Sequence, residues 1–313
     1  MKGFIKACLI AVLVFVVAGI VLLVVAAAGG VTRASLRLFV DQGRLSYGPL
    51  DNQNLVFIQD DVYQISGTDV QELEISVDAR NYEIYTSEDQ NFYIETNQNP
   101  VFIEYEDGKL SIEDEAEPGI FLGFQHYDPV TIYVPAGHLF QEFTLDVDAG
   151  SMQVNTPLVT SVFGVDIDAG AVKLNKEIQA ELVNIAIDAG NLHGYDTIQA
   201  KNQMKVSLDA GDLQLDGVKS LGLLVVECEA GDIKMQGSVL GDINAACDAG
   251  TIDLRFDGQG AIYNYQLMAD AGTIKIGGHK YSDIGHTIHI DGDVNAPTAC
   301  LRCDAGSIKV DIY

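Results

Sequence analysis

The chain has 313 residues, of which 45 are acidic and 18 are basic, and its formal net charge is −27. No acidic side chain precedes Asp41, so all of the acidic charge lies from that position onward. Such a surface excludes nucleic acid as a partner, because contacts with phosphate need basic side chains, and it excludes electrostatic docking on anionic lipid for the same reason.

The first predicted element is a transmembrane helix over residues 7–31, which follows a short N-terminal tail at 1–6. This run includes no charged or strongly polar side chain. As a helix it would span about 37 Å, enough to cross a hydrocarbon core. Ala26–Ala28 would serve as a cleavage site if the segment were a signal peptide, but the apolar run is long for one. We therefore expect an uncleaved anchor, followed by a juxtamembrane linker at 32–61.

The orientation of this anchor is not fixed by charge, because basic residues flank the apolar run on both sides. Large domains translocate largely regardless of charge. We expect a single-pass protein of the cell membrane whose remaining chain lies outside the cytoplasm.

Residues 62–142 are predicted to form an N-terminal β region, made of the first coils of a repeat and a cap. A separate small domain is the alternative. Short runs of alternating apolar residues indicate strands, and Asp107-Gly108 is a hairpin signal. The segment Leu73–Ile84 matches the repeat that follows it position by position, with Arg80 where that repeat has glycine.

From residue 143 to 313 the chain repeats an acidic residue followed by alanine and glycine, mostly at intervals of about 20 residues. The acidic residues are Asp148, Asp168, Asp188, Asp209, Glu229, Asp248, Asp270 and Asp304. Apolar residues two apart flank each motif, which is the period of a half-buried strand. Each unit therefore indicates a strand, a tight corner and a second strand. Glycine is expected to supply a positive φ at the corner.

Units of this length cannot close a core alone, but strands stacked about 4.8 Å apart would join their apolar rows into one core. The predicted fold is all-β: a β-solenoid or β-roll with one repeat unit per coil, preceded by the transmembrane helix. An irregular antiparallel sandwich is the alternative, and the steady period argues against it.

In a solenoid the eight acidic residues would lie along one corner, and we call this row the acidic ladder. One interpretation is that each carboxylate accepts backbone N–H groups of its own corner, as in an Asx-turn. The other is an array of Ca²⁺ sites with further oxygen ligands from Asp212, Glu227 and Asp232. The spacing matches no established calcium loop, so we favour the first. No catalytic or cofactor-binding residue is predicted.

Cys228, Cys247 and Cys303 occupy the inward position just before the acidic residue, where other units have apolar residues. Small core residues are the simplest interpretation. A disulfide between Cys228 and Cys247 on neighbouring coils is the alternative in an oxidising compartment. Cys300 and Cys303 form Cys-x-x-Cys, but on a strand they point to opposite faces, which argues against zinc or thioredoxin chemistry.

The last interval of the repeat, from Asp270 to Asp304, is longer than the others and contains His279, His286 and His289. It fits a loop or an irregular extra coil that enlarges the array, and the histidine spacing matches no metal motif.

The chain stops at Tyr313, just after the last repeat strands. We therefore expect an uncapped solenoid end whose strand edge is guarded by Lys309 and Asp311. Such an end would permit pairing between copies of the chain.

The order of these motifs resembles that of a bacterial adhesin-like family of β-strand-repeat proteins, a family of unknown function. The resemblance rests on Leu73–Ile84, on Asp107–Ile112, on Val130–Gly137 with its proline before the repeats, and on the acidic-Ala-Gly series. It covers roughly residues 62–313. It implies a repeat protein associated with the cell envelope, in some cases linked to envelope stress systems, and it implies no catalytic residue.

We expect a structural or adhesin-like role at the cell envelope, in which the array presents a repetitive face to wall polymer or to an envelope protein. One such face is a polar row five residues after each acidic residue: Gln153, Lys173, His193, Gln214, Lys234, Asp253, Lys275 and Lys309. A regulatory or partner-docking role in an envelope stress response is the alternative.

A β-helix polysaccharide-active enzyme is a remote alternative. Its acids and bases would stand off the repeat pattern in a groove, whereas most acidic residues of this chain fall on the pattern. The chain has no tryptophan, so sugar stacking would need residues such as Phe121, Phe124 and Tyr127.

Overall fold

The computed structural model describes residues 38–41, 44–47, 55–59, 62–67, 70–97, 101–114, 128–257 and 263–312. The chain divides into two compact units, Met1–Asp51 and Asn52–Tyr313. In the first unit, the described residues form an antiparallel pair, β1 (Leu38–Asp41) and β2 (Arg44–Tyr47). The helix predicted at 7–31 lies outside the described residues. Within the part that is described, no helix is long and apolar enough to cross a membrane.

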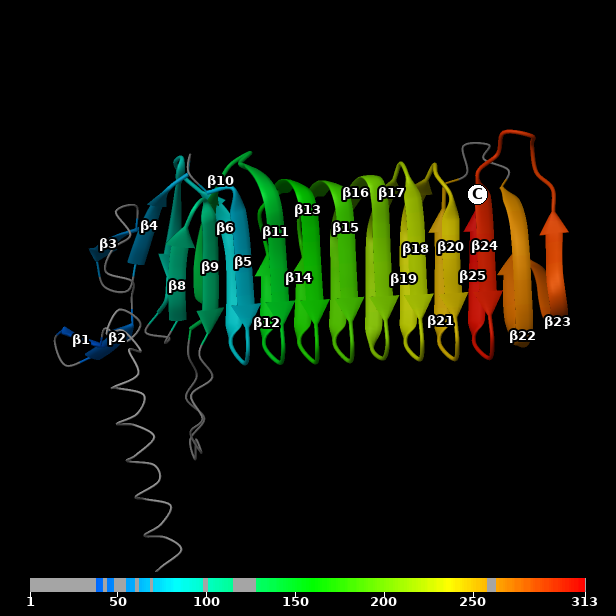
Figure 1. The fold of residues 1–313 in the computed structure, drawn as a ribbon, viewed down its shortest axis with the longest axis horizontal. Coiled ribbons are helices and arrows are strands. Elements are labelled where there is room, and N and C mark those ends of the chain that lie inside the picture. The colour runs from blue at the N-terminus through cyan, green and yellow to red at the C-terminus, as the bar shows by residue number, and fades with distance from the viewer. Residues whose placement is uncertain are drawn as a thin grey trace, which may run out of the picture. The chain divides into compact units, whose positions relative to one another are not determined.

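The second unit is built around a parallel β-solenoid, in which successive coils place their strands side by side (Figure 1). We call the strands that end before the acidic residue the A row, and those that begin after the glycine the B row. In spatial order the A row consists of β9 (Lys109–Asp114), β5 (Glu72–Val77), β11 (Leu139–Val147), β13 (Leu158–Ile167), β15 (Ile178–Ile187), the end of β16 (Asn191–Leu208), β18 (Leu223–Cys228), β20 (Ile243–Cys247), β24 (Thr298–Cys303) and the start of β22 (Asn264–Ile276). In the same order the B row consists of β7 (Asn91–Glu95), β10 (Val130–Pro135), β6 (Asn81–Ser87), β12 (Ser151–Val154), β14 (Ala171–Leu174), the start of β16, β17 (Asp212–Ser220), β19 (Asp232–Val239), β21 (Thr251–Phe256), β25 (Ser307–Ile312) and the end of β22.

The register confirms that one repeat unit makes one coil. Leu158 on β13 pairs with Ile178 on β15, and Ile178 pairs in turn with Ile198 on β16. These neighbours are parallel, as are the other A-row pairs from β9 to β22. The antiparallel sandwich that the sequence left as an alternative is therefore wrong for the array.

The core lies between the two rows and is formed by the alternating apolar residues of the repeat. Leu145, Val165 and Ile185 point inward from successive A-row strands, and Met152 and Val172 point inward from the B row; all are 3% exposed or less. Burial of a side chain of this size stabilises the fold by about 1.5–3 kcal/mol. Since each coil buries its residues only against its neighbours, the stability of a coil depends on the coil beside it.

At the C-terminal end, the strands do not stack in chain order. After β21 the chain passes over one position in the stack and forms β22, which contributes to both rows. β23 (His279–Ile290) then pairs antiparallel with β22 as the outermost strand (Figure 1). The chain finally returns to insert β24 between β20 and β22, and β25 between β21 and β22. The interval between Asp270 and Asp304 is long because the chain forms β23 at the end of the stack before it returns to form β24.

The expectation that Lys309 and Asp311 guard an exposed strand edge is wrong, because the last strand of the chain is not the last strand of the stack. Lys309 and Asp311 lie on β25, which has β21 on one side and β22 on the other. The interval that contains His279, His286 and His289 forms the extra coil that the sequence suggested, and these three side chains are exposed on β23.

The N-terminal end also departs from chain order. β5 and β6 form the first coil in the sequence, but β9 and β10 lie outside them in the stack. Antiparallel pairs of β8 (Val101–Glu106) with β9, of β7 with β10, of β4 (Val62–Ser66) with β7, and of β3 (Leu55–Gln59) with β4 complete this end. Val77 pairs with Val147, which confirms the predicted match of Leu73–Ile84 to the repeat.

Candidate functional site

The acidic ladder lies along one corner of the solenoid, as predicted, and backbone hydrogen bonds between coils hold this corner. The N–H of Asp168 donates to the carbonyl of Val147 (3.1 Å), and that of Ala169 donates to the carbonyl of Asp148 (2.7 Å). The same pattern recurs from coil to coil up to the last one. Inter-coil backbone bonds therefore hold the corner, and the carboxylates are exposed or half-exposed at its outside.

The ladder does not form a compact metal-binding cluster within the described residues, where no three His, Cys, Asp or Glu side chains come close enough to hold a metal ion. Among its members, Asp304 accepts two hydrogen bonds from the Arg302 guanidinium, at 3.1 and 3.0 Å. The Ca²⁺ array stays the less favoured alternative, to be tested by a melt with and without millimolar Ca²⁺.

The glycine of the motif is required by close approach rather than by its φ angle. Among the eight corner glycines, all within the described residues, only Gly211 has a positive φ, at +129°. A Cβ placed on Gly170 would lie 2.8 Å from the carbonyl oxygen of Gly150, and one on Gly250 would lie 2.5 Å from the sulfur of Cys228. Real Cβ atoms do not approach so closely, so the expectation of a positive φ is wrong for most corners.

Arg80 replaces this glycine at the N-terminal end of the ladder, where a side chain rather than a preceding coil borders the corner. The coil of Arg80 is bordered by β9, whose last residue, Asp114, is buried. The Asp114 carboxylate accepts the backbone N–H groups of Asp78 and Ala79, which elsewhere in the array donate to a preceding coil. It also pairs with the Arg80 guanidinium at 3.5 Å. The Asp114 carboxylate therefore takes the place of the backbone carbonyls of a preceding coil, and the Arg80 guanidinium pairs with it at this end of the ladder.

A second acidic column runs beside the first near this end. Asp146 and Asp166 lie on β11 and β13, two residues before Asp148 and Asp168, and they pair in register. Partial burial, followed by the charges of the neighbouring aspartates, raises the pKa of both carboxyls. The column therefore holds like charges that cost folding free energy at neutral pH.

Three tyrosines form an outward-facing row across neighbouring strands of the B row. Tyr133 on β10 pairs with Tyr85 on β6 and with Tyr93 on β7. The rings of Tyr85 and Tyr133 lie 6.3 Å apart at 33°. Tyr85 is 37% exposed, and the other two are half-buried. We call this row, with the carboxylates described next, the tyrosine face.

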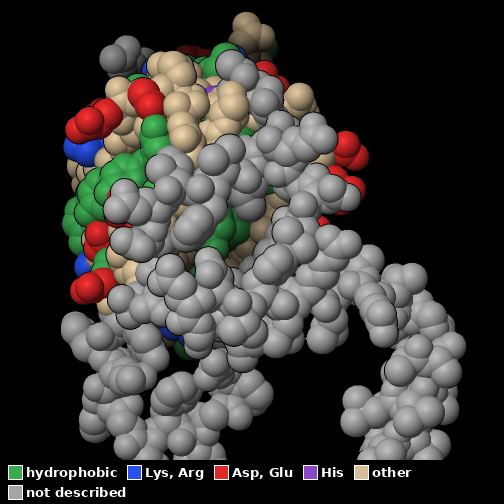
Figure 2. Space-filling model, turned by 90° about the vertical axis from the view of Figure 1, so that its left-hand side faces the viewer, with side chains coloured by type: hydrophobic (Ala, Val, Ile, Leu, Met, Phe, Trp, Pro, Cys, Tyr) green, Lys and Arg blue, Asp and Glu red, His purple; other side chains and the backbone are tan. Residues whose placement is uncertain are grey.

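Each hydroxyl of the tyrosine face donates to a carboxylate: Tyr85 to Glu83 (2.8 Å), Tyr93 to Asp89 (2.7 Å) and Tyr133 to Glu95 (3.3 Å). The bond from Tyr93, followed by the N–H of Asn91, lowers the pKa of the Asp89 carboxyl. These bonds fix the ring orientations and leave further carboxylate lone pairs for a ligand. Figure 2, which views this end of the second unit, shows hydrophobic side chains bordered by acidic ones on its left-hand side.

The tyrosine face was not predicted from the sequence, where Phe121, Phe124 and Tyr127 were the aromatic candidates. Those three lie outside the described residues. The available signal was the alternation Glu83-Ile84-Tyr85 and Tyr93-Ile94-Glu95, in which isoleucine points inward and its neighbours point outward. What the sequence could not show was that β10 lies between these two strands.

A family model described as Toastrack DUF4097 matches residues 70–302. The chain belongs to this family. Similar solved structures include proteins from Bacteroides fragilis (11% identity, TM-score 0.44, 84% of this chain and 98% of that chain covered) and Parabacteroides merdae (13%, 0.43, 83% and 97%), both named "putative adhesin". Another, from Parabacteroides distasonis, is named "Putative lipid binding protein" (18%, 0.39, 83% and 97%). No curated protein sequence matches the chain.

The inserted β24 of this Toastrack domain brings three cysteines into one buried column. Cys228 on β18 pairs with Cys247 on β20, and Cys247 pairs with Cys303 on β24. All three are at most 3% exposed, and the four cysteines of the described residues are free thiols. The hydrogen bond with Cys228, together with burial, raises the pKa of Cys247, and burial raises that of Cys303. This arrangement agrees with small core residues and argues against a reactive thiol at Cys247 or Cys303.

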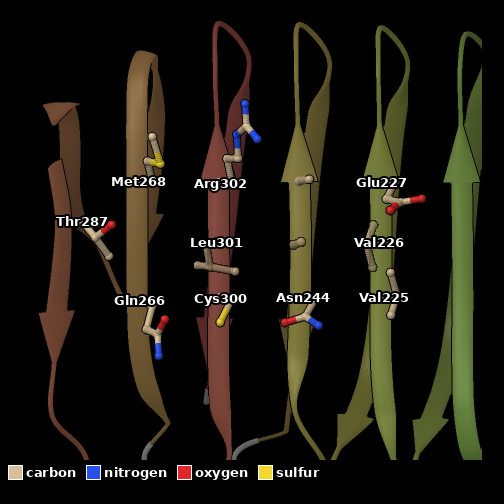
Figure 3. Close-up of a pocket in the computed structure, with 12 residues that line it drawn as sticks. Val225, Val226, Glu227, Asn244, Gln266, Met268, Thr287, Cys300, Leu301 and Arg302 are labelled. Atoms are coloured by element: carbon tan, nitrogen blue, oxygen red, sulfur yellow. The ribbon is translucent and has the colours of Figure 1, made fainter. Parts of the chain in front are cut away.

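A hollow of about 290 Å³ lies on the outer surface of the A row near the C-terminal end of the domain (Figure 3). It exists because Asn244 and Ala246 on β20 are small, while Glu227 on β18 and Arg302 on β24 are longer. Met268, which is 37% exposed, lines it from β22. Its lining of apolar groups with one carboxylate and one guanidinium suits a protein side chain better than an anionic polymer.

Proposed function

We propose that this Toastrack protein is anchored in the cell membrane by residues 7–31 and presents its β-solenoid outside the cytoplasm as a structural or adhesin-like component of the cell envelope. The solenoid would bind wall glycan through the tyrosine face. The proposal assigns no catalytic role and no cofactor to the chain.

The tyrosine face carries this proposal. Aromatic rings stack on the apolar faces of sugars, and tyrosine adds a polar group at the ring edge. Carboxylates beside the rings can accept hydrogen bonds from sugar hydroxyls. Because Tyr85, Tyr93 and Tyr133 lie on adjacent strands, they form a row in which the rings of Tyr85 and Tyr133 are 6.3 Å apart. A repetitive polymer would therefore meet a repetitive row of rings.

The net charge of −27 limits which wall polymer the tyrosine face could bind. An anionic wall polymer would be repelled unless cations intervene, whereas a neutral or amino-bearing glycan would not. The polar row from Gln153 to Lys309 along the B row offers a less acidic continuation of the same surface.

The test is co-sedimentation of the full chain, held in lipid nanodiscs, with purified cell-wall sacculi, with and without Ca²⁺. Saturable binding should fall at least about tenfold in a Tyr85→Ala, Tyr133→Ala double variant. Tyr195→Ala is the matched control, because Tyr195 is 50% exposed on the same row of strands but stacks on His193 outside the tyrosine face. Equal binding by all forms would reject the tyrosine face.

The anchor and its orientation need a separate test. Protease added to cells with permeable outer layers should remove the solenoid while a cytosolic control protein stays intact. Protection of the solenoid together with that control would contradict the proposed location.

A second candidate function, partner docking in an envelope stress response, is favoured by the hollow between Glu227 and Arg302. An Ala246→Trp variant would fill this hollow. Loss of tolerance to envelope-active drugs in that variant, with sacculus binding unchanged, would favour the regulatory role over the adhesive one.

A further inference from the structure

β23 is the outermost strand at the C-terminal end of the solenoid. It pairs with β22 from Tyr265↔Ile290 to Ile276↔His279, and no other strand of the described residues pairs with it. Its outer edge therefore presents backbone N–H and C=O groups over two straight segments, one extending the A row and one extending the B row. Such an edge is a template for another strand.

The inward side chains of β23 are incompletely covered, unlike those of the coils behind it. Tyr281, Ile288 and Ile290 pack against the core but remain partly exposed. Leu267 and Ile274, at the corresponding inward positions of β22, are 0% exposed. The end of the core is thus open to one more strand that carries apolar inward residues.

We propose that β23 pairs antiparallel with β23 of a second copy of this chain, which closes the open end of both solenoids. The pattern of the strand is self-complementary. With Tyr281 opposite Ile288 of the second copy, the partly buried apolar side chains of the two edges meet, and Ile290 lies opposite the exposed His279 of that copy. The two-fold axis of this register passes through the corner of β23 and exchanges the A row of one copy with the B row of the other.

The local charge permits a second copy at this place although the chain is strongly acidic. β23 contains one lysine, one aspartate and three histidines, so the strand itself is close to neutral. The acidic ladders of the two copies would begin at their Asp270 residues, three strand spacings or about 14 Å apart. That distance exceeds the screening length of about 8 Å at physiological ionic strength.

Self-pairing also explains why the contact would stop at two copies. An isologous contact uses the same strand on both sides and closes on itself. Pairing of β23 with the opposite end of another solenoid would instead be heterologous and would build open filaments, which sedimentation would detect as species larger than a dimer.

Cysteine cross-linking of the full chain in nanodiscs tests the register without altering the core. Ser282 and Thr287 are exposed on β23, and the proposed register places each opposite the other residue in the second copy. A mixture of Ser282→Cys chains and Thr287→Cys chains should give a cross-linked dimer under mild oxidation. Each variant alone should cross-link at least about fivefold less, because equivalent residues would lie roughly 17 Å apart along the strands.

Sedimentation equilibrium of the full chain and of two lysine variants supplies the affinity. Ile288→Lys places a charge on the inward side of the edge, and it should weaken the dimer at least about tenfold. Thr287→Lys, one residue away on the outer side, is the matched control and should leave the dimer in place. A monomer at all concentrations, filaments, or equal cross-linking in mixed and single variants would overturn the proposal.

Discussion

The middle of the solenoid and its C-terminal end are built from the same repeat but assembled in different orders. In the middle, β13 and β15 belong to coils that are consecutive in the sequence and adjacent in the stack, with Leu158 beside Ile178. At the end, β24 lies beside β20, which places Ile243 next to Ala299. The repeat therefore specifies the shape of a coil, while its place in the stack is set by which positions remain open when the strand arrives.

At the N-terminal end, too, the order of strands in the stack differs from their order in the chain. There the first coil in sequence, β5 and β6, lies inside β9 and β10, which come later in the chain. Both ends finish in antiparallel strands, whereas the middle has parallel neighbours. Because the pairings at both ends join residues far apart in sequence, we expect the ends to form later than the middle during folding.

The largest expected loss of stability comes from adding a methyl group to a corner glycine in the middle of the solenoid. Gly190→Ala would place a Cβ against Ile167 and the backbone of Gly170, and should destabilise the domain by about 3 kcal/mol or more. Gly137→Ala is the matched control: its φ is +68° but no atom lies within 4 Å of the added Cβ, so the cost should be about 1 kcal/mol. Urea unfolding measures both. Equal costs would mean that close approach between coils does not select glycine at the corners.

The next effect in size concerns the Asp114 carboxylate at the end of the acidic ladder, on which the stability of the domain should depend. Asp114→Ala removes the acceptor of the Asp78 and Ala79 N–H groups and the partner of Arg80, and should cost about 2–3 kcal/mol. Asp114→Asn keeps an acceptor oxygen of the same shape and should cost less. The same urea measurement applies, and an Asn variant as unstable as the Ala variant would contradict the capping role.

The smallest expected effect concerns the second acidic column. The pKa values of Asp146 and Asp166 are raised in the folded state, so their ionised forms disfavour folding above that raised pKa. Asp166→Asn should therefore stabilise the domain at pH 7, by on the order of 0.5 kcal/mol after solvent screening. The gain should disappear as the pH falls below the unfolded pKa of about 3.9, where the carboxyl becomes protonated in both states. Melting curves at pH 7 and pH 3.5 test this, with the exposed Glu181→Gln as control.

The features of the fold that recur in every coil could be predicted from the sequence. Alternating apolar residues around each acidic-Ala-Gly motif predicted the strands, the corner, the coil length and the inward cysteines. Arg80 was visible as an exception, but its partner Asp114 was not, because that carboxylate belongs to a strand that reaches the coil from the far side.

What the sequence could not predict depends on stacking order. The column from Cys247 to Cys303 requires β24 to be inserted, and nothing local to either cysteine records this. The tyrosine face likewise needs β10 between β6 and β7. The role assigned to glycine was wrong because close approach between coils is a property of the stack, not of the corner's own residues.

The insertion of β24 is tested most directly by a disulfide between residues 244 and 300, which pair on the outer surface of β20 and β24. In a chain with Asn244→Cys, and with Cys8, Cys228, Cys247 and Cys303 replaced by alanine, mild oxidation with diamide followed by peptide mapping should find this bond, since directly paired residues on neighbouring strands lie within disulfide range. In a second chain, with Gln266→Cys added and Cys300→Ser, residues 244 and 266 should stay unlinked, because residue 300 lies between them. A bond between residues 244 and 266, with none between 244 and 300, would show that the coils stack in chain order and would contradict the account.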